Sequence, residues 1–127
     1  LEIDTGHIVY SNGGHLAPLH WRDGRMNILP IPKGTIIGVI PGGKYVHSEV
    51  VLNRGDFLLC FTDGVSEAQT SAGEEYSESR LLDVVKTIAS HSLESILSHV
   101  RIDVADFSGD SRLADDFTML AIRKLSV

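Results

Sequence analysis

Carboxylates stand next to two apolar segments of this chain, at positions where they could hold a metal ion. Asp63 directly follows the strand expected over residues 57–62, and Asp115 and Asp116 directly precede the strand expected over residues 117–125. If the two strands pair side by side and antiparallel, the end of one meets the start of the other, and the carboxylates converge at one rim of the sheet. Converging carboxylates repel unless a proton or a cation lies between them. Oxygen ligands with no His or Cys among them suit Mg²⁺ or Mn²⁺.

The same residues also have a simpler interpretation as turn formers. Asp-Gly and Asp-Asp pairs are frequent in turns, because Asp accepts hydrogen bonds from the nearby backbone and Gly adopts conformations that other residues avoid. Ten of the 17 acidic residues are Asp, and five of those lie between Asp103 and Asp116, so short acids are common in this part of the chain. By spacing alone, turns are favoured over a metal site.

The elements that must position these residues change character halfway along the chain. Short strand-like segments separated by Gly, Pro and Asp turns fill the first half, and Asp23-Gly24 is a typical two-residue hairpin turn. The segment 57–62 is apolar on both faces, which predicts a central strand covered on both sides. Apolar residues at helical spacing predict one helix after Ser77 and a second with Ser92 as its N-cap. Mostly antiparallel strands, then two helices and a closing strand, predict an α+β layered domain.

Composition limits the classes of protein to which the chain can belong. Its 127 residues, 43 % of them hydrophobic, predict a single domain with one core. The formal net charge of −6 and the scattered Lys and Arg residues argue against nucleic acid or an anionic membrane surface as partner. No apolar run approaches the ~18 residues of a transmembrane helix. The single cysteine, Cys60, excludes an internal disulfide, fits a reducing compartment such as the cytoplasm, and lies among apolar residues as a core side chain would.

Five short segments then stand out in a fixed order. They are SNGGHLAP at residues 11–18, IIGV at 36–39, LNRGDFL at 52–58, FTDGVSEA at 61–68 and ADDFTML at 114–120. In the same order they resemble the segments N-A-G-H-x-P, P-L-G, L-x-x-G-D-x-L, TDG-V-x-E-A and D-D-x-T-x-L of the metal-dependent PPM protein phosphatases. The resemblance is to the branch typified by bacterial stage II sporulation protein E. One such segment is weak, but five in order over nearly the whole chain make a specific match.

The resemblance implies a fold, a reaction and a set of site residues. The fold is a β-sandwich flanked by helices, in α-β-β-α layers, and the reaction is hydrolysis of phosphoserine or phosphothreonine in a protein by a water that two Mn²⁺ or Mg²⁺ ions activate. Asp63 and Asp115 match the family's metal aspartates. Glu67 matches an acidic position linked with a third metal, and Asp116 is expected to orient its neighbours. His15 is a candidate to face the phosphate, with stabilisation of its own turn as the alternative.

One element of the family pattern is missing from these residues. The family has a further aspartate, in a D-x-x-G-H-G segment upstream of the N-A-G-H turn, that bridges both metals. Asp4-Thr5-Gly6-His7 imitates part of it, but we interpret these residues as a hairpin turn between strands at 1–3 and 8–10. The chain also opens directly on strand-like sequence. We therefore expect residues 1–127 to be the C-terminal portion of one phosphatase domain, with its N-terminal part absent, and to be inactive alone.

Two smaller departures from the family pattern concern packing. Gly13 stands where Ala is usual, and Tyr76-Ser77 stands where relatives have F-G. Neither change removes a residue with a chemical role, so we expect both to affect only local structure.

The resemblance also suggests a cellular role. Relatives in this branch commonly act on phosphorylated anti-anti-sigma-type regulators in bacterial partner switching, often behind a sensor or receiver domain that can tether the whole protein to a membrane. The residues themselves name no substrate, and a homodimer is left open. The alternative is a catalytically incomplete regulatory module that binds a protein partner, for example by pairing at an exposed sheet edge. The sequence encoded upstream of Leu1 would distinguish the two.

Overall fold

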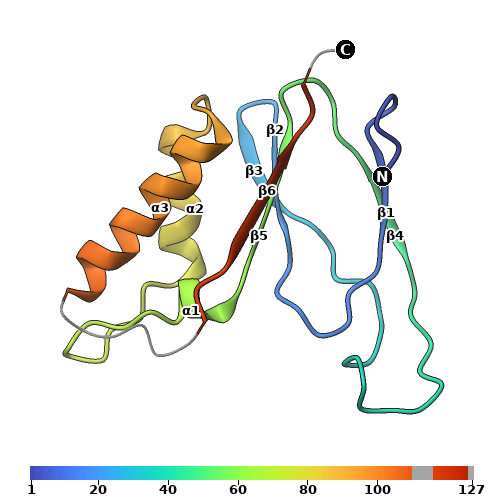
Figure 1. The fold of residues 1–127 in the computed structure, drawn as a ribbon, viewed down its shortest axis with the longest axis horizontal. Coiled ribbons are helices and arrows are strands. Elements are labelled where there is room, and N and C mark those ends of the chain that lie inside the picture. Colours follow the sequence, from blue (N-terminus) through green and yellow to red (C-terminus); the bar gives the residue numbers. More distant parts are fainter. Residues whose placement is uncertain (110–115, 126–127) are drawn as a thin grey trace.

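The computed structural model describes residues 1–109 and 116–125, which form an α+β domain of two antiparallel sheets and three helices (Figure 1). Among the described residues, none of the helices has both the length and the apolar character needed to cross a membrane. The elements follow one another as β1 (His7–Tyr10), β2 (Leu19–Arg22), β3 (Arg25–Ile28), β4 (Ser48–Val51), β5 (Phe57–Phe61), α1 (Asp63–Ser66), α2 (Glu78–Ile88), α3 (Leu93–Ser108) and β6 (Met119–Arg123).

The two sheets and the two long helices form three layers. The larger sheet has the strand order β3-β2-β5-β6, and the smaller one pairs β1 with β4. In Figure 1 the helices α2 and α3 cover one face of the larger sheet, and the smaller sheet lies on its other face. This arrangement confirms the expected α+β fold with two sheets. The described residues contribute helices to one side of the sandwich only.

The strand β5 is central, as its apolar sequence predicts. Phe57, Leu59 and Phe61 belong to the main core against the helices and are at most 2 % exposed. Leu58 points the other way and joins a small cluster with Ile8 of β1 on the smaller sheet. Because successive side chains of a strand point to opposite faces, both faces of β5 must be apolar.

The helix α3 begins at its predicted cap, Ser92, and α2 begins after Ser77, which the structure shows to be its cap. The Ser77 hydroxyl accepts a hydrogen bond from the Arg80 N–H, and the Ser92 hydroxyl accepts one from the Ser95 N–H at 3.1 Å. Each bond satisfies a backbone donor that the first turn of a helix leaves free. At the other end of α2, the Arg123 guanidinium of β6 donates to the carbonyl oxygen of Ala89 at 2.9 Å. The last strand therefore also fixes the helical layer.

The N-terminal residues differ from expectation. Residues 1–3 form no strand. A turn spans residues 3–5, closed by the Glu2 N–H, which donates to the His7 carbonyl oxygen at 2.8 Å, and β1 pairs with β4, with His7 opposite Val51. The turn is held at the C-terminal end of β6, where the Lys124 ammonium donates hydrogen bonds to the carbonyl oxygens of Ile3 and Asp4. The predicted turn around Asp4 is therefore confirmed, but the predicted strand at residues 1–3 is wrong, and the strand that pairs with β1 is β4.

A buried polar cluster joins β2 to the start of β5. The Asp56 carboxylate accepts a hydrogen bond from the Arg22 Nε at 2.9 Å and another from the backbone N–H of Asn53 at 2.9 Å. His20 lies beside it, with its Nε2 3.5 Å from the same oxygen, and His20 and Asp56 are each 4 % exposed. Burial lowers the pKa of His20, and the opposing attraction of Asp56 is the smaller effect.

The lowered pKa of His20 predicts a loss of stability in mild acid. The unfolded chain binds a proton at His20 near pH 6.5, whereas the folded chain keeps the ring neutral to lower pH. The contribution is therefore complete above pH 6.5 and is lost as the pH falls towards the folded pKa, with a slope of up to about 1.4 kcal/mol per pH unit. Urea unfolding at pH 7.5, 6.5 and 5.5 should show a smaller pH dependence for His20→Gln than for the wild type. His99→Gln, a change at an exposed position of α3, should keep the wild-type slope; equal slopes for all three proteins would contradict the prediction.

Candidate active site

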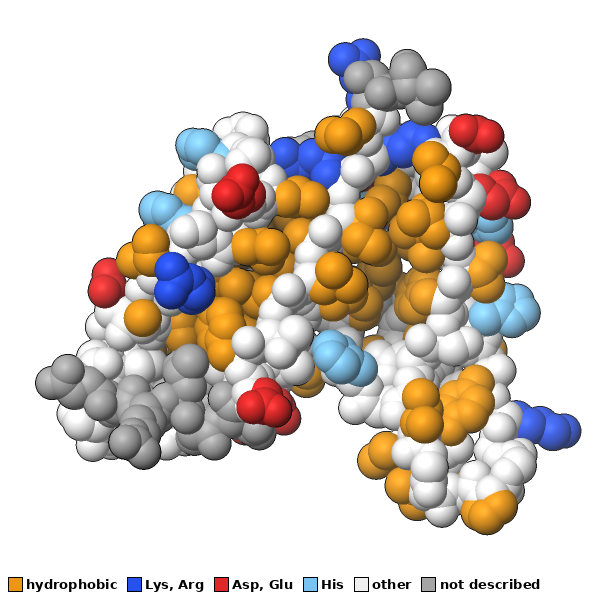
Figure 2. All heavy atoms as spheres, viewed as in Figure 1, with side chains coloured by type: hydrophobic (Ala, Val, Ile, Leu, Met, Phe, Trp, Pro, Cys, Tyr) orange, Lys and Arg blue, Asp and Glu red, His pale blue; other side chains and the backbone are white. Residues whose placement is uncertain are grey.

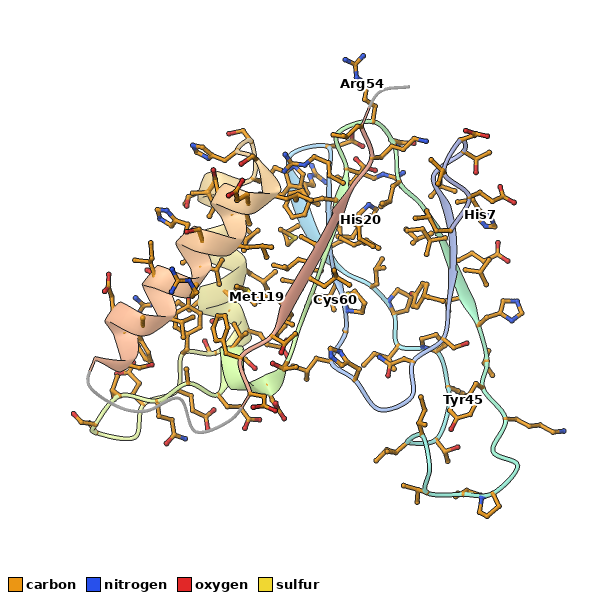
Figure 3. The ribbon with its side chains drawn as sticks, viewed as in Figure 1. His7, His20, Tyr45, Arg54, Cys60 and Met119 are labelled. Atoms are coloured by element: carbon orange, nitrogen blue, oxygen red, sulfur yellow. The ribbon has the colours of Figure 1, made fainter. Side chains whose placement is uncertain are left out.

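The rim formed by the end of β5 and the start of β6 is the candidate site. The two strands pair antiparallel, with Phe61 opposite Met119, and the pairing continues through the Thr62 N–H, which donates to the Thr118 carbonyl oxygen at 3.0 Å. The strand pairing expected from the sequence is thereby confirmed, and Asp63 lies at the same rim as Asp116. Figure 3 shows the two strands side by side through the labelled residues Cys60 and Met119. Asp115 lies outside the described residues.

Thr62 fastens this rim, a role that the sequence did not reveal. Its hydroxyl donates a hydrogen bond to the Asp116 carbonyl oxygen and accepts one from the Thr118 N–H at 3.0 Å. As the N-cap of α1 it makes no side-chain capping bond. Its hydroxyl is thus committed to the neighbouring strand, which fixes the backbone on both sides of the carboxylates. The only signal in the sequence is a single hydroxyl residue between an apolar strand and an acid.

Asp63 opens α1, a single helical turn. The Asp63 carboxylate accepts a hydrogen bond from the Gly64 N–H at 3.0 Å, and its carbonyl oxygen accepts one from the Glu67 N–H at 2.7 Å. Val65 is fully buried and holds the turn against the main core. Residues four apart on a helix share a face, so Asp63 and Glu67 present two exposed carboxylates at one rim.

The turn at residues 12–15 faces Asp63 across a small pocket. The Asn12 side chain holds this turn, because its Oδ1 accepts from the N–H groups of Gly14 and His15, both at 2.8 Å, and its Nδ2 donates to the His15 carbonyl oxygen at 2.7 Å. The turn is thus held mainly by Asn12. The exposed His15 lines a pocket of about 140 Å³ together with Thr62 and Asp63, a position compatible with contact to a phosphate.

Both departures from the family pattern have packing explanations. A Cβ atom at residue 13 would lie 2.3 Å from the Ile37 Cγ1, so the glycine lets Ile37 pack against the turn. Tyr76 is buried, its hydroxyl donates to Asp103 of α3 at 2.7 Å, and its ring meets Phe107 edge-on. Burial raises the pKa of the Tyr76 hydroxyl, which suits a permanent hydrogen-bond donor. Tyr76 therefore packs α2 and the preceding loop against α3.

Two other acids from the matched or imitated segments lie away from the rim. Asp4 sits where Lys124 holds the N-terminal turn, at the opposite end of β6 from Asp116. Asp56 lies just before β5, whereas Asp63 follows that strand. The position of Asp4 agrees with its interpretation as a turn residue.

The donor set at the rim has the chemistry of a site for a hard divalent cation. Asp63, Glu67 and Asp116 offer carboxylate oxygens, which are the ligands that Mg²⁺ and Mn²⁺ prefer. Within residues 1–109 and 116–125, however, no three His, Cys, Asp or Glu side chains lie close enough together to form a complete metal site. The described residues fit the cation in ligand type but supply only part of its coordination.

The fold of two sheets with helices on one face is shared with PP2C-type (PPM) phosphatase domains of known structure. Residues 1–125 match the family model described as stage II sporulation protein E (SpoIIE), so the chain belongs to that family.

Similar proteins agree with this assignment. The chain is 26 % identical to the phosphoserine phosphatase RsbU of Bacillus subtilis over 97 % of its own length and 36 % of that protein. It is 24 % identical to the protein IcfG of Synechocystis over 96 % of its length and 19 % of that protein. The chain thus spans only about a fifth to a third of these curated relatives.

Solved structures share the fold. The RsbU and RsbW domains of Rv1364c from Mycobacterium tuberculosis superpose with a TM-score of 0.81 at 25 % identity, over 98 % of this chain and 34 % of that one. The SiaA-PP2C domain of Pseudomonas aeruginosa gives a TM-score of 0.76 at 23 % identity, over 93 % of this chain and 46 % of that one.

Proposed function

We propose that the protein containing these residues is a phosphatase that hydrolyses phosphoserine or phosphothreonine in a protein substrate. The observation that supports this most directly is the antiparallel pairing of β5 and β6, which brings Asp63 to the same rim as Asp116 in a chain of the SpoIIE family. Hydrolysis of phosphate monoesters is among the slowest uncatalysed reactions, so a site for it needs strong charge stabilisation.

In this proposal the rim carboxylates hold two Mn²⁺ or Mg²⁺ ions. Asp63 and Asp115 would be direct ligands, Glu67 would serve a third metal or the surroundings of the first two, and Asp116 would orient its neighbours. Such ions, when bound, lower the pKa of water and neutralise charge on the phosphoryl oxygens. Thr62 would hold the spacing of the ligands through its bonds to residues 116 and 118. His15, across the pocket, would contact the phosphate.

The names of the relatives support a role in partner switching. One relative is a phosphoserine phosphatase, and one solved relative joins an RsbU domain to an RsbW domain. We propose that the substrate is a phosphorylated regulator of the anti-anti-sigma type, met in the cytoplasm. We further propose that residues 1–127 are the C-terminal portion of the catalytic domain, which a sensor or receiver domain precedes in the complete chain, and that two copies can pair.

The alternative function is that of a regulatory module that binds a protein partner without catalysis. Among the described residues, too few ligands converge to complete a metal site. In such a module the rim carboxylates would serve only as turn formers. The two functions differ in whether the complete protein releases phosphate.

Phosphate release by the complete natural protein tests the proposal. With a protein bearing phosphoserine or phosphothreonine as substrate, we expect release that requires Mn²⁺ or Mg²⁺, stops with EDTA and returns when the metal is restored. The 127 residues alone should release negligible phosphate, because two aspartates bind a pair of divalent ions poorly. Metal-independent release, or none from the complete protein, would refute the proposed function. Robust turnover by the 127 residues alone would show that no upstream aspartate is needed.

A further inference from the structure

The loop that joins β3 to β4, residues 30–47, exposes many apolar side chains. Figure 2 shows hydrophobic side chains gathered on this loop, at the lower right of the view. Patches of this kind are uncommon on soluble proteins and mark sites of interaction. Six of its aliphatic residues are each 53–73 % exposed: Ile31, Ile36, Ile37, Val39, Ile40 and Val46.

The 30–47 loop is fastened to the rest of the domain at its base. The Tyr10 hydroxyl donates to the Pro30 carbonyl oxygen at 2.8 Å, and the Ser11 hydroxyl donates to the Val46 carbonyl oxygen at 3.0 Å. The two arms of the loop are joined by the Val46 N–H, which donates to the Lys33 carbonyl oxygen at 3.2 Å. Because the loop is already held in place, a partner that binds it does not have to order it, and the entropy cost of binding is smaller.

The 30–47 loop adjoins the candidate active site. The Ile37 N–H donates to the Gly13 carbonyl oxygen at 3.0 Å, in the turn that ends at His15. His15 and Asp63 line the same pocket. The loop and α1 both lie at the lower end of Figure 1. A protein segment whose phosphorylated residue enters that pocket therefore has the loop within reach.

The charge of this region is opposite to that of the chain as a whole. Residues 30–47 contain no Asp or Glu and include Lys33 and Lys44, in a chain whose formal net charge is −6. Lys33 and Lys44 are exposed, and neither forms an ion pair with a carboxylate of the described residues. The loop thus offers apolar contacts and unpaired positive charge beside a rim of carboxylates.

We propose that the 30–47 loop is the docking surface for the phosphoprotein substrate and that it takes an acidic segment with apolar side chains beside the phosphorylated residue. This proposal rests on the proposed phosphatase function. A second copy of the chain is the poorer occupant, because the loop has no acid to pair with its own lysines. Two lysines are also fewer than the cluster of basic residues that an anionic membrane surface typically needs.

The test measures hydrolysis of two phosphopeptides and of one small substrate by the complete protein. The peptides contain one phosphoserine each and have equal length, one with Glu and Leu around the phosphoserine and the other with Lys and Ser; p-nitrophenyl phosphate is the small substrate. We expect Lys33→Glu/Lys44→Glu to lower kcat/KM for the acidic peptide about tenfold, as two exposed charge pairs should, and to raise it for the basic peptide. Hydrolysis of p-nitrophenyl phosphate should not change, because that substrate has no flanking residues.

Matched variants separate local charge from overall charge and from apolar contact. Arg54→Glu/Arg101→Glu makes the same change in net charge at exposed positions outside the loop, and Arg54 lies at the opposite end of the molecule from Tyr45 of the loop (Figure 3). This control should keep the wild-type ratio of kcat/KM for the acidic peptide to kcat/KM for the basic peptide. Val39→Ser/Ile40→Ser should raise KM for the acidic peptide and leave p-nitrophenyl phosphate unaffected.

Each contrary result has a distinct meaning. If the wild type hydrolyses p-nitrophenyl phosphate but the lysine variant keeps the wild-type peptide preference, the docking proposal is overturned and the phosphatase function stands. If the wild type hydrolyses none of the three substrates, the phosphatase function itself fails. An unchanged peptide preference together with loss of a dimer, or loss of binding to vesicles of anionic lipid, in Val39→Ser/Ile40→Ser would assign the loop to self-association or to a membrane and overturn the proposal.

Discussion

Replacing Asp63 by asparagine in the complete protein should lower kcat/KM for a phosphoserine substrate by about 1000-fold. Asparagine keeps the size of the side chain and one oxygen but removes the charge that attracts a divalent cation. Metal ions supply several kcal/mol of charge stabilisation in the transition state, and each ~1.4 kcal/mol corresponds to a factor of ten in rate. Phosphate release at saturating Mn²⁺ measures the effect.

The fold should survive this substitution. Asp63 is exposed, and the burial that holds α1 in place is that of Val65. Circular dichroism and the midpoint of thermal unfolding should therefore match the wild type. Asp83→Asn, the same change at an exposed residue of α2 that pairs with Lys86 at 3.2 Å, is the control and should keep full activity. Wild-type activity in Asp63→Asn would show that the rim carboxylate binds no essential metal.

Replacing Asp56 by alanine should destabilise the protein by about 3 kcal/mol, the largest stability effect we expect from a single charged residue here. The change leaves the Arg22 Nε and the Asn53 N–H without their acceptor beside the buried His20, while the Arg22 Nη2 keeps its bond to the Val51 carbonyl oxygen. Removing one partner of a buried ion pair costs about 3–5 kcal/mol, and the low end applies because the Arg22 side chain is 33 % exposed and still hydrated. Urea unfolding at pH 7.5 measures the change.

Two controls give the Asp56 prediction its meaning. Asp56→Asn keeps an acceptor oxygen and should lose less than half as much stability. Asp106→Ala, at an exposed position of α3, should change stability by less than about 0.5 kcal/mol. Activity per folded molecule should be unchanged in Asp56→Ala, because residue 56 and the rim lie at opposite ends of β5. A selective loss of activity with full stability would instead place Asp56 in the active site.

Asp56 and Asp63 show that a sequence motif can place an acidic residue without revealing whether it stabilises the fold or belongs to the site. Both are acids in segments that resemble the family's, and both flank the same apolar strand. An acid before a five-residue strand and an acid after it lie at opposite ends of that strand. The sequence predicts that geometry, but only the partners of each acid show that Asp56 stabilises the fold.

The sequence by itself determined the elements and the family. A two-sided apolar pattern placed β5, helical spacing of apolar residues placed α2, the Ser92 cap placed the start of α3, and the order of five segments identified the SpoIIE family, because such patterns depend only on neighbours along the chain. Only the tertiary structure decided that β1 pairs with β4, that Thr62 fastens the carboxylate rim, and that the 30–47 loop lies beside His15. Those features depend on contacts between residues far apart in the sequence, such as His7 with Val51, 44 positions apart, and Thr62 with Thr118, 56 positions apart, and the local pattern around either residue does not contain its partner.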